Sequence, residues 1–136
     1  MDKKILEDIN NLKNISFLYE DALLFLECIQ DKFESILLTC GGEKNQKDKI
    51  KVCDINHFFS EIIITPEDKS KLDNVDYKNS VFIDNNPKEV IRFLNAGAKK
   101  VIRIRRNTDK YSKIDLNISN VEEYTSLDGV LVGLGI

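Results

Sequence analysis

The sequence has few of the residues on which common catalytic and structural sites are built. Its 136 residues include no tryptophan, one histidine (His57) and three cysteines, which show no Cys-x-x-Cys spacing. A zinc site built on several histidines is therefore excluded, and no serine and histidine stand in a motif for nucleophilic catalysis. Three unclustered cysteines favour free thiols in a reducing cytoplasm over a disulfide framework. We expect His57 to have a packing or surface role.

Long apolar runs and a strong excess of one charge are also missing. No stretch approaches the roughly 20 apolar residues that a membrane-spanning helix needs. The net charge is −3, with 42% hydrophobic and 32% charged residues. Nucleic acids and anionic membranes select an excess of lysine and arginine, so we expect neither as a partner. The composition and length indicate one folded cytoplasmic domain over residues 1–136.

The clearest local pattern is a strand, turn, helix and strand over residues 81–104. A short run of β-forming apolar residues ends at Asp84. Asn86 and Pro87 suit the N-cap and first turn of a helix, and Gly97 suits its left-handed end. This βαβ unit places a carboxylate at the carboxyl end of a strand, the edge at which open α/β sheets bind ligands.

Apolar periodicity predicts the remaining elements. These are helices over 3–12, 20–33 and 43–54, strands over 36–39, 62–65 and 101–106, and a short strand near 114–118 followed by a helix start at 120–123. Strands that alternate with helices indicate a three-layer, Rossmann-like α/β fold, with a parallel sheet flanked by helices. In the strand over 101–106, arginines alternate with apolar residues, which is typical of a protected edge strand.

Three residues with suitable chemistry follow one another along these strands. Thr39 ends one strand, Lys69 follows the next and Asp84 ends the third, in the motifs Ile-Leu-Leu-Thr-Cys-Gly, Pro-Glu-Asp-Lys and Phe-Ile-Asp-Asn-Asn-Pro. In this order and spacing the chain resembles the haloacid dehalogenase-like (HAD-like) superfamily over about residues 18–132. The members of that superfamily are mostly phosphohydrolases. The resemblance implies phosphoryl transfer to an aspartate, Mg²⁺ as the cofactor and a phosphorylated small molecule as the ligand.

The resemblance implies a role for four residues. Thr39 would donate its hydroxyl to a phosphoryl oxygen, and Lys69 would neutralise negative charge, with Lys71 as the alternative. Asp84 would bind Mg²⁺ as a hard oxygen ligand. Asn85 stands where many relatives have a second aspartate. Its amide keeps an oxygen for the metal but removes one negative charge, which should weaken metal binding.

One part of the family pattern is missing. Relatives carry their nucleophile in an Asp-x-Asp motif on a strand that precedes all the others, and this sequence contains no Asp-x-Asp. We therefore predict a HAD-like core that lacks its first central strand, between the strands ending at Thr39 and Asp84, with residues 1–17 as a remnant of a helical cap. Three repairs are open: direct pairing of the neighbouring strands, insertion of residues 15–18 or 129–136, or a strand from another chain in a homodimer or complementing partner.

Two functions follow from this pattern. The first is a HAD-like phosphohydrolase-type domain, built for Mg²⁺-dependent phosphomonoester hydrolysis but catalytically incomplete because the nucleophilic aspartate is absent from a truncated or split chain. The alternative is a non-catalytic protein that uses the fold as a binding or interaction module, which Asn85 and the missing motif favour. In both cases we expect the isolated chain to be inactive as a phosphatase. The substrate does not follow from the sequence.

Overall fold

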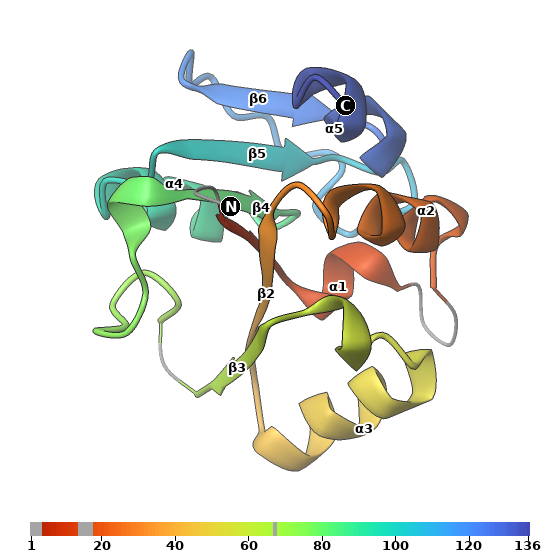
Figure 1. The fold of residues 1–136 in the computed structure, drawn as a ribbon. Coiled ribbons are helices and arrows are strands. Elements are labelled where there is room, and N and C mark those ends of the chain that lie inside the picture. The colour runs from red at the N-terminus through yellow and green to blue at the C-terminus, as the bar shows by residue number, and fades with distance from the viewer. Residues whose placement is uncertain (1–3, 14–17, 67) are drawn as a thin grey trace.

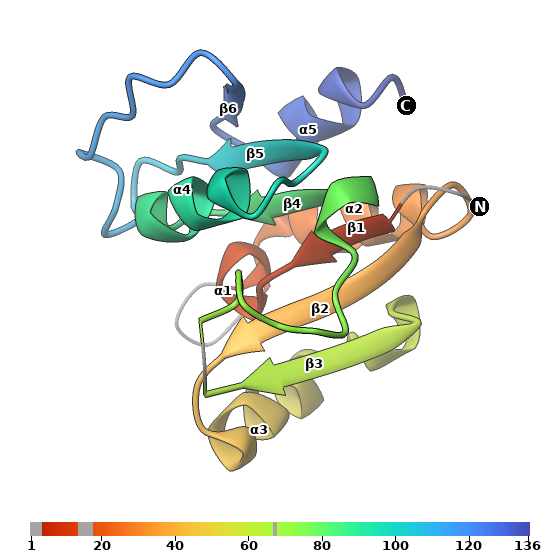
Figure 2. The same cartoon turned by 90° about the vertical axis from the view of Figure 1, so that its left-hand side faces the viewer.

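One parallel sheet organises the protein (Figures 1 and 2). The computed structural model describes residues 4–13, 18–66 and 68–136. Six strands pair in the order β3-β2-β1-β4-β5-β6, and every pairing is parallel. The strands are β1 (Lys4–Glu7), β2 (Glu34–Cys40), β3 (Glu61–Thr65), β4 (Ser80–Asp84), β5 (Lys100–Ile104) and β6 (Val121–Tyr124). The predicted three-layer, Rossmann-like α/β fold is confirmed.

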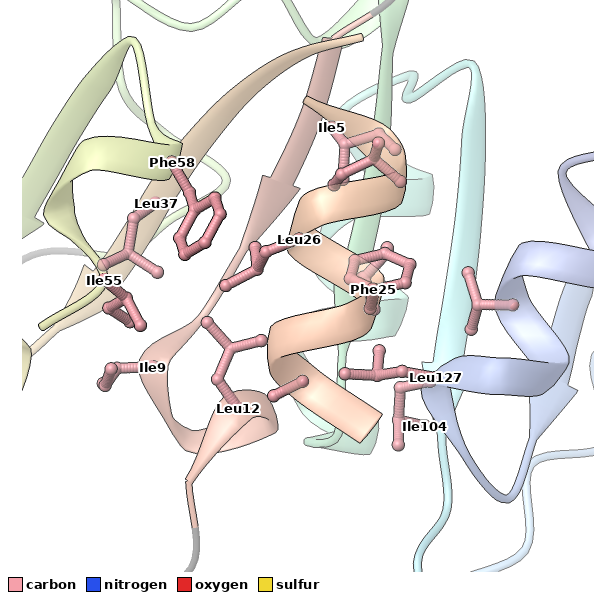
Figure 3. Close-up of a cluster of buried hydrophobic side chains, with 14 of the residues drawn as sticks. Ile5, Ile9, Leu12, Phe25, Leu26, Leu37, Ile55, Phe58, Ile104 and Leu127 are labelled. Carbon is pink, nitrogen blue, oxygen red and sulfur yellow. The ribbon is translucent and has the colours of Figure 1, made fainter. Parts of the chain in front are cut away.

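Helices cover both faces of the sheet. They are α1 (Ile9–Leu12), α2 (Glu20–Ile29), α3 (Glu43–Cys53), α4 (Pro87–Asn95) and α5 (Leu127–Gly133). One core cluster joins the sheet to α1, α2, α3 and α5, and a second lies under α4. Figure 3 shows Phe25 and Leu26 of α2 among the side chains of the first cluster, where they are 0% and 1% exposed. Burial of each such side chain contributes about 2 kcal/mol. Among the described helices, none is long and apolar enough to cross a membrane.

The centre of the sheet differs from the sequence prediction. Strand β1 pairs with β2 on one side and β4 on the other, so that Glu7 lies opposite both Leu37 and Ile83. It fills the slot that we predicted to be empty. The missing central strand and the helix over residues 4–7 are therefore wrong predictions. Strand formation here gives the backbone groups of β2 and β4 hydrogen-bond partners that a gap would have left unpaired.

No outside strand is needed to repair the sheet. Of the segments considered for the slot, 129–136 forms part of α5 and its end, and 15–17 lies outside the described residues. Residues 4–7 belong to the core sheet and 9–12 to a short helix beside it, rather than to a cap. Within the described residues, the central strand thus comes from the amino-terminal end of the same chain.

The other edge of the sheet also differs from the prediction. Strand β5 is an inner strand between β4 and β6, and Arg103 is fully buried, with its guanidinium donating to the Tyr111 carbonyl at 2.8 Å. The strand predicted at 101–106 is present as β5, but the prediction that it lies at the edge of the sheet is wrong. The last strand is β6, where we predicted a helix start, and residues 114–118 are irregular.

Candidate functional site

Two aspartates meet at the carboxyl edge of the sheet. Asp84 ends β4, and Asp8 directly follows β1 in the parallel register that pairs Glu7 with Ile83. The ammonium Nζ of Lys69 lies between them, 2.8 Å from Oδ2 of Asp8 and 2.6 Å from Oδ2 of Asp84. The three side chains are only 3% to 5% exposed. We call these residues the Asp8–Lys69–Asp84 triad.

The backbone that follows each aspartate holds its carboxylate in place. Asp8 is the N-cap of α1, and its Oδ1 accepts the backbone N–H of Asn10 at 2.9 Å. Oδ1 of Asp84 accepts the backbone N–H of Asn86, also at 2.9 Å. In both residues one oxygen is bound to the backbone and the other to the ammonium. This arrangement fixes the carboxylates before any ligand binds.

Lys69 is positioned by the loop after β3. The Tyr77 hydroxyl donates to the Lys69 carbonyl and accepts the backbone N–H of Leu72 at 2.9 Å. These two hydrogen bonds hold the backbone of the loop around Lys69 in place. Nζ of Lys69 also lies 5.9 Å from the centroid of the Phe93 ring. Lys71 is exposed. The structure therefore brings Lys69, and not Lys71, to the two aspartates.

The triad perturbs the protonation of Lys69 and Asp84. Burial disfavours the ammonium form of Lys69, but the charges of Asp84 and Asp8 outweigh burial and raise the pKa of Lys69 above its ordinary value. Burial raises the pKa of the Asp84 carboxyl, because Lys69 offsets this effect only in part and Asp8 adds a like charge. Two carboxylates that share one cation carry a surplus of negative charge, which a further cation or the loss of a charge can relieve.

A cleft of about 580 Å³ opens at this edge of the sheet. All three members of the triad line it, together with Asn10, Cys40, Asn85 and Asp109. Three lysines add positive charge around the same cleft: Lys13, Lys49 and Lys110. A larger cleft, about 830 Å³, lies between α3 and β3, but none of the triad lines it. Of these two clefts, only the smaller one is lined by several buried charged groups, so we take it as the candidate site.

Solved structures that align with this chain include proteins named as HAD-like hydrolases. YfnB from Bacillus subtilis, named as a HAD-hydrolase and solved bound to magnesium, aligns over 88% of this chain with a TM-score of 0.69 and 14% identity. The core domain named as that of a phosphoglycolate phosphatase from Streptococcus pneumoniae aligns over 99% of the chain, with a TM-score of 0.66 and 11% identity. The chain has the HAD-like fold.

The lengths of these proteins differ from that of the chain. The chain spans 57% of YfnB but 96% of the streptococcal core domain. It also covers 96% of an uncharacterized protein from Listeria monocytogenes serotype 4b, with a TM-score of 0.73, 15% identity and 97% of this chain aligned. No protein-family model matches the sequence, and no curated protein matches it significantly. At these identities the likeness establishes the fold alone.

Asp8 is the site residue that the sequence analysis missed. It directly follows the central strand β1, where the resemblance places the nucleophile. A signal was present, because Asp8-Ile9-Asn10 differs from Asp-x-Asp by one amide and follows the apolar pair Ile5-Leu6. The prediction that the chain lacks a carboxylate at this position depended on the missing strand.

Thr39 lies away from the cleft. Strand β2 continues to Cys40, which lines the cleft, while Thr39 is fully buried and donates its hydroxyl to Oε1 of Gln46 at 3.1 Å. Successive side chains of a strand point to opposite faces, so Cys40 faces the cleft and Thr39 faces the other way, toward Gln46 of α3. Of the predicted catalytic pair, the structure places Lys69 at the aspartates and Thr39 beside Gln46.

Asn85 lines the cleft next to Asp84. Its Nδ2 donates to Oδ2 of Asp109 at 2.6 Å. Because a carboxylate only accepts, this bond fixes which end of the amide is the nitrogen and leaves the amide oxygen on the other side. Asp109 comes from the long loop after β5, which the sequence analysis did not connect with the site. Asn85 therefore remains a candidate oxygen donor, oriented by Asp109.

Proposed function

We propose that the protein is a phosphohydrolase-type domain that transfers a phosphoryl group to Asp8. The triad carries this proposal: a carboxylate at the end of the central strand is held against an ammonium and a second carboxylate, at 2.8 and 2.6 Å. A nucleophile, a fixed cation and a metal-binding carboxylate are the groups that phosphoryl transfer through an aspartate requires. Under this proposal the chain supplies its own nucleophile, whereas the sequence analysis expected the nucleophile to be absent.

The residues of the triad have separate tasks in this reaction. An oxygen of Asp8 attacks the phosphorus in line with the leaving group and forms an aspartyl phosphate. Lys69 offsets the negative charge that gathers on the phosphoryl oxygens. The backbone N–H of Asn10 holds Asp8 at the strand end, so little rearrangement is needed during the attack.

The donor atoms of the cleft fit Mg²⁺. Asp8, Asp84 and the amide oxygen of Asn85 are hard oxygen donors, and proteins usually hold Mg²⁺ with one or two carboxylates plus water and substrate phosphate. In the part of the chain that the structure describes, no group of three or more histidine, cysteine, aspartate or glutamate side chains could hold a metal. Bound Mg²⁺ would neutralise phosphoryl charge, and Asn85 in place of a carboxylate should make its binding weak.

A second candidate is a phosphate-binding module without turnover. Asn10 and Asn85, both in the cleft, are amides at positions beside the two aspartates, and amides contribute neither charge nor a transferable proton. This candidate predicts that phosphate and Mg²⁺ bind but that no phosphoryl group moves to the protein.

Turnover of p-nitrophenyl phosphate with Mg²⁺ separates the two candidates. We expect wild-type turnover above background and a loss of at least about 10²-fold in Asp8→Asn and Asp84→Asn. The matched control is Asp31→Asn, because Asp31 is an exposed aspartate outside the cleft. A thermal melt of each variant checks that it folds. No wild-type turnover, with a midpoint still raised by phosphate and Mg²⁺, would favour the binding module.

A further inference from the structure

The three lysines that line the cleft in addition to Lys69 come from different parts of the chain. Lys13 is the C-cap of α1, Lys49 lies on α3, and Lys110 lies in the loop after β5. Lys13 and Lys49 are half-buried and Lys110 is exposed, whereas the triad is almost excluded from water. The three lysines therefore lie nearer to solvent than the site of phosphoryl transfer.

The residue spacing in α3 turns Lys49 toward this cleft. Gln46 is buried, and Lys49 follows it by three residues, so the two side chains are neighbours on the helix surface. Lys47 and Lys51 lie on the other side of the helix, where they line the larger cleft. Of the three lysines, Lys49 alone faces the cleft of the triad.

The loop after β5 is held in place on both sides of Lys110. Before it, Oδ2 of Asp109 accepts from the Asn85 amide at 2.6 Å. After it, the Tyr111 carbonyl accepts from the buried guanidinium of Arg103 at 2.8 Å. The backbone at position 110 is therefore fixed beside the cleft before a ligand binds, which lowers the entropic cost of binding.

Lys49 and Lys110 form no ion pair within the described part of the chain. Nζ of Lys110 lies 5.1 Å from the centroid of the Tyr111 ring. By contrast, Lys47 and Lys100 are paired with glutamates at 2.9 and 2.6 Å. Two cations without a carboxylate partner, both beside a cleft, leave their charge for an anionic ligand.

The kind of cation favours a phosphate group over a carboxylate. Arginine binds a planar carboxylate through two parallel N–H groups, whereas lysine binds phosphate as a point charge. Of the described residues that line the cleft, four are lysines and none is an arginine. Ammonium groups from three directions also suit the three terminal oxygens of a phosphate group.

We infer that the substrate carries two phosphate groups: one is transferred to Asp8, and Lys13, Lys49 and Lys110 bind the other. This inference rests on the proposed function and names the substrate class of the same site. Lys13 lies about 8 Å from Asp8 along the axis of α1, at a rise of about 1.5 Å per residue. A cleft of about 580 Å³ accommodates a small molecule of that span.

The second phosphate takes no part in the bond changes. An Asp8 oxygen forms the bond to the first phosphorus, and the bond from that phosphorus to the bridging oxygen breaks with its electron pair on the oxygen. This oxygen takes a proton from water, and the product keeps the second phosphate. Binding of the second phosphate by the lysines holds the first phosphate at Asp8 and so raises kcat/KM.

Three donors with a three-carbon chain test the inference. Phosphate release would be measured with glycerol phosphate, glycerol bisphosphate and phosphoglycerate, each with its groups on terminal carbons and with Mg²⁺. We expect kcat/KM for the bisphosphate to exceed the other two values at least about 10-fold, the typical effect of a hydrogen bond to a charged group. Equal values for the bisphosphate and either other donor would overturn the inference. Turnover of p-nitrophenyl phosphate in the same protein would show that the proposed function stands.

Two pairs of lysine variants locate the second phosphate. Lys49→Ala and Lys110→Ala should each lower kcat/KM for glycerol bisphosphate about 10-fold and narrow its ratio to the value for glycerol phosphate. Lys44→Ala and Lys113→Ala are the matched controls, at exposed positions of α3 and of the same loop that do not line the cleft. Equal losses in all four variants would mean that the lysines act only through the overall field of the protein, which would overturn the inference.

A binding measurement decides the inference even without turnover. Thermal melts at equal free Mg²⁺ would compare propane bisphosphonate, with one phosphonate on each terminal carbon, and propylphosphonate. We expect a higher midpoint with the bisphosphonate in the wild type and a smaller difference in Lys49→Ala. That result without turnover of any donor would contradict the proposed function and support the second phosphate site. Equal midpoints with the two ligands would overturn the inference.

Discussion

Asp8 and Asp84 accept hydrogen bonds from the same ammonium group, Nζ of Lys69, at 2.8 and 2.6 Å. These three groups are almost excluded from water, so each depends on the others for its charge. Loss of one carboxylate leaves a balanced ion pair. Loss of the ammonium leaves two adjacent carboxylates without a cation, which is the costlier change.

Lys69→Met should therefore destabilise the protein strongly at neutral pH. We expect a loss of about 3 kcal/mol in the free energy of unfolding, because two buried carboxylates lose their cation. The loss should shrink as the pH falls and the carboxylates gain protons. Urea unfolding of both proteins at several pH values measures this. Lys71→Met, at an exposed neighbour, is the control and should change stability by less than about 0.5 kcal/mol. Equal effects of the two variants would contradict the account of the triad.

Glu7 should make the protein less stable as the pH rises. Its side chain is 2% exposed, and within the described chain neither carboxyl oxygen has a hydrogen-bond partner. Burial raises the pKa of Glu7 well above its ordinary value of 4.5. The folded protein then keeps a proton that the unfolded chain loses, so stability is full below that ordinary value and falls as the pH rises toward the folded pKa.

Glu7→Gln should remove this pH dependence. We expect the variant to match the wild type near pH 4 and to be more stable near pH 8, with up to about 1.4 kcal/mol gained for each pH unit between the unfolded and folded pKa. Urea melts across this pH range measure the difference. Glu27→Gln, at an exposed glutamate, should show no such trend. A variant that is less stable than the wild type at every pH would show that Glu7 is ionised and paired.

The Thr39 hydroxyl should act on stability more than on the reaction. Thr39→Val removes the donor from the buried Oε1 of Gln46, which should cost about 1 to 3 kcal/mol. The double variant Thr39→Val with Gln46→Met removes both polar partners and should lose less than the two single changes added together. The phosphorylation rate per folded molecule should be unchanged. A drop of tenfold or more in that rate at unchanged stability would instead place the hydroxyl on a phosphoryl oxygen.

Most of the sheet could be predicted because several of its strands are continuous apolar runs. Strands β2, β3 and β4 were found in this way, and the turn with Asn86 and Pro87 forms the predicted start of α4. Strand β1 could not be found, since it has four residues and ends in the buried Glu7. The apolar residues of segment 3–12 also recur at helical spacing. Segment 4–7 forms a strand because it pairs with β2 and β4, which are distant in sequence. A local sequence pattern carries no information about such pairing.

The candidate site could be predicted only in part. Asp84 and Lys69 were found from their places at and after strand ends, and the structure joins them. Asp8 was missed with its strand. Thr39 was predicted at the site as the last residue of its strand, but β2 continues to Cys40, whose side chain lines the cleft, and neighbouring side chains of a strand point to opposite faces. Such a difference of one residue cannot be determined from an apolar run.

The central claim is that Asp8 receives the phosphoryl group, and chemical trapping tests it most directly. The protein would be incubated with acetyl phosphate and Mg²⁺, quenched, and reduced with borohydride, which converts an aspartyl phosphate to homoserine. Peptide mass spectrometry then locates the homoserine. The account predicts it at position 8 of the wild type and its absence from Asp8→Asn. Homoserine at another aspartate, or none after reaction with acetyl phosphate, would contradict the account.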